Sequence, residues 1–179
     1  MLSRDSNKKN LKINNPEKLK ITLVVSEWHS DITNKLFTGA KDSLIKNGVL
    51  DGNIKRVNVP GSFELIYGCR IAQNDDQHAI IAIGCIVKGE TPHFDFICNA
   101  VSIGIKDLNI LYKTPVIFCV LTDNNIEQSH ERSGGEYFSN QSYCGDGGRQ
   151  YAANYSFFFA LWSSPESSWR EWKTFAINL

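Results

Sequence analysis

The segment from Lys88 to His93 combines residue types that could bind a phosphate group and transfer a proton. It reads Lys-Gly-Glu-Thr-Pro-His and follows an apolar run, 79–87, that is long enough for a strand buried on both faces. Thr91 has the chemistry of a helix N-cap, and Pro92 suits the first helical position. A helix N-terminus presents free N–H groups and a positive dipole end to an anion. Because a histidine can pass protons near neutral pH, the segment predicts an enzyme-like site with a phosphate cradle beside His93.

The elements that must position this segment alternate along the chain between strands and helices. Apolar residues after the turn recur at steps of three and four, typical of one buried helix face: Phe94, Ile97, Cys98, Val101, Ile105 and Leu108. The same reasoning predicts further strands at 20–26, 53–59 and 115–121, and helices at 31–47, 62–73 and 125–132. Gly48 is expected to stop the first helix and Ser62 to cap the second. This alternation predicts a parallel sheet with right-handed crossovers, in a three-layer α/β domain.

Length and charge exclude several classes of protein. The 179 residues suffice for one substantial core, and 19 basic against 19 acidic residues give no sign of a nucleic-acid partner. No apolar run approaches the roughly 20 residues of a membrane span, so we expect no membrane partner. The basic first residues lack the apolar region of a secretory signal, which leaves a targeting arm or a solvated tail. We expect a flexible arm at 1–19, an α/β domain at 20–135 and a divergent segment at 136–179.

The cysteines and histidines give no indication of a metal site. Five cysteines are an odd number without close-paired metal spacing, and the four histidines are scattered. Cys85 and Cys119 lie inside apolar strands, where cysteine is usually a small buried hydrophobic residue. This usage indicates a reducing cytoplasm, with no disulfide framework and no zinc.

The predicted topology locates the site at one edge of the sheet. Ligands of open parallel sheets bind beyond the carboxyl ends of the strands, where polar or aromatic residues follow each predicted strand: 27–29, 61–64, 88–93 and 122–123. Trp28 and Phe63 are large aromatics in turns where solvent would be expected. They suit either a flat heterocycle or packing against a neighbouring subunit.

Five ordered motifs resemble the 6,7-dimethyl-8-ribityllumazine synthase family. They are V-V-S-E-W-H, V-P-G-S-F-E, G-C-I-V-K-G-E-T-P-H-F-D, P-V-I-F-C-V-L-T and I-E-Q-S-H-E-R-S-G-G, spread over residues 20–135. The resemblance implies condensation of 5-amino-6-(D-ribitylamino)uracil with 3,4-dihydroxy-2-butanone 4-phosphate, without a metal or redox cofactor, in riboflavin biosynthesis. It also implies a flavodoxin-like α/β/α sandwich on a four-stranded parallel sheet. Pentamers or multiples of them are expected, with active sites between subunits and riboflavin synthase as a candidate partner.

The resemblance also implies roles for individual residues. Trp28 would stack on the pyrimidine ring, Glu64 would accept hydrogen bonds from ribityl hydroxyls, and His93 would transfer protons. Backbone groups lining the substrate pocket would come from Ser62, Phe63, Val87 and Lys88. The phosphate cradle would consist of Gly89, Glu90 and Thr91. From the adjacent subunit, Phe118 would cover the ring and Arg132 would bind the phosphate.

The chain departs from the family pattern at two places. His29 replaces the usual asparagine, for which we expect altered substrate contact. After Gly135 the family's lysine-containing segment is missing, with Gln141 in the lysine's place, and an aromatic-rich stretch follows at 157–162. That stretch fits a substitute helix, a subunit contact or an altered reading frame.

These departures motivate a second hypothesis, a non-catalytic assembly or ligand-binding protein that retains the fold and the pocket. A flavodoxin-like signalling or electron-transfer module is disfavoured. The first loop lacks a Ser/Thr-rich flavin-phosphate signature, and Asp31 and Asp42 do not form a receiver-type acidic pocket. An active synthase is the leading hypothesis.

Overall fold

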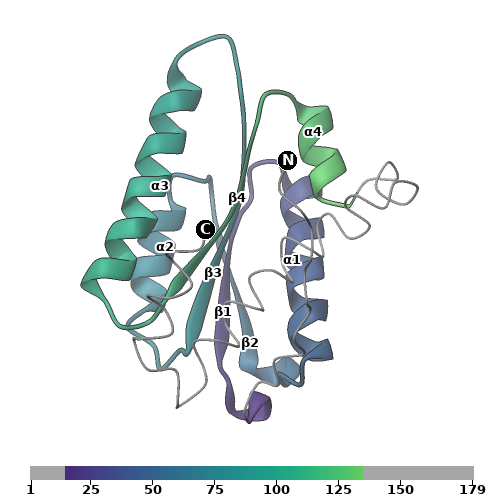
Figure 1. Ribbon diagram of the computed structural model, residues 1–179, viewed down its shortest axis with the longest axis vertical. Helices are drawn as coiled ribbons and strands as arrows, with labels where there is room; N and C mark the ends of the chain where they lie inside the picture. The colour runs from purple at the N-terminus through teal and green to yellow at the C-terminus, as the bar shows by residue number, and fades with distance from the viewer. Residues whose placement is uncertain (1–14, 135–179) are drawn as a thin grey trace, which may run out of the picture.

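A computed structural model describes residues 15–134, which form a four-stranded parallel sheet with helices on both faces (Figure 1). The strands are β1 (Ile21–Ser26), β2 (Ile54–Val59), β3 (Ala79–Val87) and β4 (Val116–Asp123), in the order β2-β1-β3-β4. The helices are α1 (Ser30–Lys46), α2 (Leu65–Ala72), α3 (His93–Leu111) and α4 (Ile126–Arg132), with 3-10 turns η1 (Pro16–Lys18) and η2 (Asp51–Asn53). The predicted three-layer α/β/α sandwich is confirmed.

The hydrophobic core has two layers, one on each face of the sheet. Alternate residues of β1 point to opposite faces, so that Leu23 packs with α1 residues while Val24 packs with residues of α2 and α3. In Figure 1, α2 and α3 cover one face, and α1 and α4 cover the other. All six residues of β1 are buried, because both faces of the strand are covered.

The predicted elements are present, but two predicted helix caps are wrong. Ser62 does not cap a helix, because α2 begins at Leu65 and the Ser62 hydroxyl instead donates a hydrogen bond to the carbonyl of Cys85, at 3.3 Å. Thr91 does not cap α3, which begins at His93 after Pro92 without a side-chain cap. The predicted stop at Gly48 is confirmed: it follows α1 with a φ of 93°, which glycine adopts without strain.

Burial explains the cysteines in the strands. Cys85 and Cys119 are almost fully buried, as predicted. Burial raises the pKa of the Cys119 thiol to about 12, and burial is also the main reason that the pKa of Cys85 is raised. Both residues therefore act as small hydrophobic side chains rather than as nucleophiles.

Residues 15–134 cover only part of the predicted domain organisation. The 136–179 segment and most of the 1–19 arm lie outside the described residues, although Leu19 is buried in the core. Within residues 15–134, no helix is long and apolar enough to span a membrane. The same residues contain no cluster of three or more histidine, cysteine or acidic side chains that could hold a metal ion.

Candidate active site

Backbone hydrogen bonds connect the segments at the carboxyl ends of neighbouring strands, in two pairs. The Glu27 N–H donates to the carbonyl of Val59 at 2.8 Å, and the Trp28 N–H donates to that of Pro60 at 3.1 Å. These bonds place the loop after β1 beside the loop after β2. Between the neighbouring strands β3 and β4, the Lys88 N–H donates to the carbonyl of Asp123 at 2.9 Å. The predicted meeting of these segments at the carboxyl edge is therefore present in the structure.

Trp28 and His29 form a strained turn between β1 and α1. The Trp28 side chain is 68% exposed, so its indole is open to contact a ligand or another subunit. His29 has a φ of 57° and a ψ of 50°, in the left-handed region. Asparagine, aspartate and histidine are the side-chain-bearing residues most often found there. Histidine and asparagine, the residue of the family pattern, both adopt this backbone conformation more readily than most residues.

A buried hydroxyl connects the loop after β2 to β3. The bond from Ser62 to the Cys85 carbonyl fastens this loop to the end of β3. A Cβ atom at position 61 would lie 2.9 Å from Glu64 Oε2, so the Glu64 carboxylate lies over Gly61 and glycine leaves room for it. Phe63 is 50% exposed. Ser62 is thus a buried anchor, while Phe63 and Glu64 are presented at the surface.

The loop after β3 is exposed and leads into the first turn of α3. Val87 is half-buried, whereas Lys88, Gly89, Glu90 and Thr91 are exposed. A Cβ atom added at Gly89 would meet no atom within 4 Å, and the residue has no positive φ, so the described fold itself does not require glycine there. His93 is the first residue of α3, is exposed, and forms no hydrogen bond or ion pair through its side chain within residues 15–134. Its imidazole is therefore available to a ligand.

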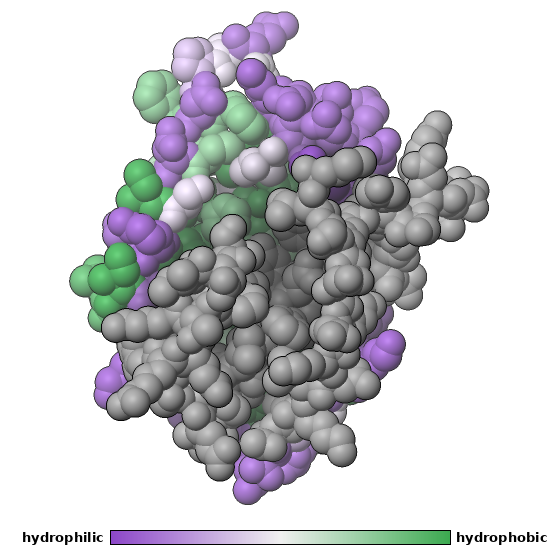
Figure 2. All heavy atoms as spheres, viewed as in Figure 1, coloured by the Kyte–Doolittle hydropathy of each residue, from purple (hydrophilic) through white to green (hydrophobic). Residues whose placement is uncertain are grey.

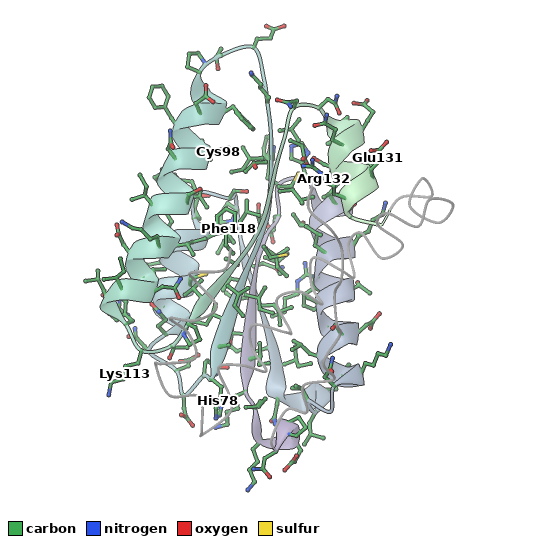
Figure 3. All side chains as sticks on the ribbon, viewed as in Figure 1. His78, Cys98, Lys113, Phe118, Glu131 and Arg132 are labelled. Carbon is green, nitrogen blue, oxygen red and sulfur yellow. The ribbon has the colours of Figure 1, made fainter. Side chains whose placement is uncertain are left out.

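Arg132 lies beside the end of β4, where it pairs with Asp123 (Figure 3). Asp123 is only 1% exposed. One carboxylate oxygen accepts a hydrogen bond from the Arg132 guanidinium, and the other accepts from the Ser129 hydroxyl at 2.7 Å. Sequence reasoning placed Asp123 at this edge without a role and missed Ser129. The available signal was their spacing: Asp123 ends a strand, and Ser129 and Arg132 lie three residues apart, on one face of the short helix that follows.

Phe118 does not reach this edge of its own sheet. It pairs with Ala82 in the middle of the β3–β4 ladder, whereas the last pair of that ladder is Val87 with Asp123. In Figure 3, Phe118 lies away from the end of the sheet where Arg132 is found. The ring is half-buried on the α2 and α3 face. Of the predicted site residues, Phe118 alone is separated from the others within the described part of the chain.

The fold and this edge define an open α/β protein whose ligand site lies beyond the carboxyl ends of parallel strands. The family model described as 6,7-dimethyl-8-ribityllumazine synthase matches residues 18–156. It thus continues past Gly135, where the recognisable motifs end. The match covers most of the chain, which belongs to the 6,7-dimethyl-8-ribityllumazine synthase family.

Individual relatives agree with this assignment. The 6,7-dimethyl-8-ribityllumazine synthase of Christiangramia forsetii is 57% identical over 127 residues, which span 70% of this chain and 76% of the relative. The enzyme of the same name from Flavobacterium johnsoniae is 53% identical over 124 residues, or 69% and 65% of the two chains. That of Parabacteroides distasonis is 47% identical over 120 residues, or 66% and 75%.

The left-handed conformation of His29 predicts an ordered response to substitution. His29→Val should lower the free energy of unfolding by about 1–2 kcal/mol, because a β-branched side chain is strained at positive φ. His29→Asn should leave it within about 0.5 kcal/mol. Urea unfolding of both variants at one protein concentration measures this difference; equal stability of the two would contradict the assigned strain.

Proposed function

We propose that this chain condenses 5-amino-6-(D-ribitylamino)uracil with 3,4-dihydroxy-2-butanone 4-phosphate, forming 6,7-dimethyl-8-ribityllumazine with release of phosphate and water. The family match over residues 18–156 carries this proposal. The loops that meet at the carboxyl edge support it, because they contain the residues that the reaction needs. The comparisons do not favour the non-catalytic alternative. The reaction as proposed needs no cofactor, since it involves only condensation and elimination.

The phosphate-bearing substrate is proposed to bind at the loop before α3. The N–H groups of His93 and Phe94, in the first turn of α3, have no partner within residues 15–134 and suit an anion. Gly89 supports this role, because its small size lets a ligand approach the backbone closely. Glu90 and Thr91 complete the cradle, and Arg132 of an adjacent subunit adds a guanidinium. That cation stabilises the charge that develops as phosphate leaves.

The pyrimidine substrate is proposed to bind between the loops after β1 and β2. The exposed indole of Trp28 offers a flat surface for ring stacking. Glu64 is exposed in the loop after β2 and can accept hydrogen bonds from ribityl hydroxyls. Backbone groups of Ser62, Phe63, Val87 and Lys88 line the pocket, and Phe118 of the adjacent subunit closes it. Holding both substrates together lowers the entropic part of the barrier.

His93 is proposed as the group that transfers protons during imine formation and phosphate elimination. His93→Ala should lower kcat by roughly 10²-fold, within the range that a positioned acid–base group contributes, while both substrates still bind. His78→Ala is the matched control. His78 lies at the opposite end of the strands (Figure 3), where its Nδ1 accepts a hydrogen bond from the Lys20 N–H at 3.1 Å. Steady-state kinetics measure both variants; an unchanged kcat in His93→Ala would remove its assigned role.

Subunit association is proposed to occur through the outer side of α2 and α3. Phe96, Ile103 and Ile110 recur every seven residues along α3 and are 71%, 54% and 69% exposed. This stripe lies away from the core residues of the same helix, and Figure 2 shows hydrophobic side chains along the α3 side of the molecule. Tyr67 and Leu111 border a groove of about 600 Å³ between the two helices. Apolar residues at seven-residue spacing suit helix packing against another copy.

A pentamer, or a multiple of it, would bury this stripe and bring Phe118 and Arg132 to a neighbour's site. Riboflavin synthase remains a candidate partner of such an assembly. We also propose a cytoplasmic location, which the free cysteines among the described residues support.

The proposed interface predicts that Ile103→Lys separates the assembly into smaller species with little activity, since a charge in an apolar contact is costly. Ile45→Lys makes the same change at an exposed isoleucine of α1 and should retain the mass and the activity. Light scattering coupled to size-exclusion chromatography measures the mass. An Ile103→Lys protein of unchanged mass would show that this stripe is not a subunit contact.

A further inference from the structure

We propose that Asp123 is a positioning residue, which holds the Arg132 guanidinium in the orientation that binds the substrate phosphate. The inference rests on the proposed function, in which Arg132 contacts that phosphate. Asp123 itself touches neither substrate. It acts through the arginine.

The Asp123 carboxylate is buried, and its hydrogen bonds are directed at α4. Its Oδ1 accepts from Arg132 Nη1, and its Oδ2 accepts from Ser129, which is also buried. Ser129 in turn accepts a weak hydrogen bond from the Cys85 thiol, 3.4 Å away. A buried carboxylate is costly unless it is paired and hydrogen-bonded. Asp123 therefore restricts α4 to arrangements that keep Ser129 and Arg132 against it.

Helix α4 has little apolar packing to orient it otherwise. Ser129 is the only buried residue among its seven, and Ile126 is partly buried against the core. Its first turn is ordered by Asn125, whose side chain accepts from the Gln128 N–H at 3.0 Å. Its last turn, which carries Arg132, is held by polar contacts: His130 lies 3.4 Å from the Asp31 carboxylate of α1, and Arg132 pairs with Asp123. The direction of the guanidinium thus depends on the ion pair with Asp123.

The ion pair leaves the guanidinium able to bind an anion. A guanidinium has five N–H donors, and the contact with Asp123 uses Nη1. The Arg132 side chain remains 46% exposed, so other donors can face a phosphate. The Asp123 carboxylate binds one side of the guanidinium, and its other N–H groups face the ligand. This arrangement preorganises the cation and reduces the entropic cost of binding.

The backbone of Asp123 has a separate role, at the phosphate loop of its own subunit. Its carbonyl accepts the Lys88 N–H at 2.9 Å, and its partner in the ladder is Val87. The residue therefore anchors the start of the proposed phosphate loop by its backbone and Arg132 by its side chain. Replacement of the side chain alone would disturb the second contact and retain the first.

The test compares Asp123→Asn, Arg132→Ala and the double variant in the full-length protein. Asp123→Asn should raise the KM for the phosphate-bearing substrate about tenfold and raise the Ki of inorganic phosphate in parallel. The KM for the uracil substrate should change less than about twofold. In the Arg132→Ala background, Asp123→Asn should add less than about twofold, because its effect passes through the arginine. Asp51→Asn, which removes a carboxylate paired with Lys41 on the surface, is the control.

Ser129→Ala provides a milder variant if Asp123→Asn fails to fold. It removes one hydrogen bond to the carboxylate without changing the charge, and should raise the same KM about threefold and depend equally on Arg132. An equal effect of either variant with and without Arg132, or a fall in kcat with both KM values unchanged, would overturn the inference. So would normal kinetics in Asp123→Asn while Arg132→Ala weakens phosphate binding. If Arg132→Ala itself leaves the Ki of phosphate unchanged, the role of Arg132 under the proposed function fails instead.

Discussion

Burial of the parallel sheet on both faces determines where this chain can place its reactive side chains. All six residues of β1 are buried, as are the first eight of β3, so these strands cannot present chemistry on their faces. Most side chains proposed to contact substrate therefore lie in the loops at the strand ends rather than on β1 or β3. Because the strands are parallel, the loops that follow them meet at one edge. Trp28, Glu64 and His93, far apart in the sequence, reach this edge for that reason.

A few buried polar groups convert this meeting of loops into an ordered site. Ser62 bonds the loop after β2 to the end of β3, and Asp123 bonds Arg132 and Ser129 to the end of β4. Each of these groups lies where burial makes an unmade hydrogen bond expensive. Several residues proposed to contact substrate are, in contrast, exposed: Trp28, Phe63, Glu64, Lys88 and His93. At this edge, buried polar groups hold the loops in place by hydrogen bonds, and exposed side chains remain available for ligands.

The sequence predicted the elements well because strong local patterns specify them. The apolar runs of β1, β3 and β4 and the glycine at position 48 are features of neighbouring residues. The two wrong caps depend on distant contacts or on the exact start of a helix. Ser62 is a good cap by type, but its hydroxyl is taken by Cys85, which is far along the chain. The ion pair of Arg132 with Asp123 and the left-handed conformation of His29 were likewise not predicted. The spacing brings Arg132 near the end of β4 without specifying its partner, and residue type alone does not specify the dihedral angle of His29.

A turnover measurement is the direct test of catalysis at this edge. The full-length protein would be mixed with the ribitylaminouracil and the butanone phosphate, and lumazine formation followed by absorbance, with the uncatalysed rate subtracted. Catalysis at this edge predicts a rate above background that is proportional to protein concentration and saturates with each substrate. A rate equal to background, in protein that still binds the lumazine product, would contradict it.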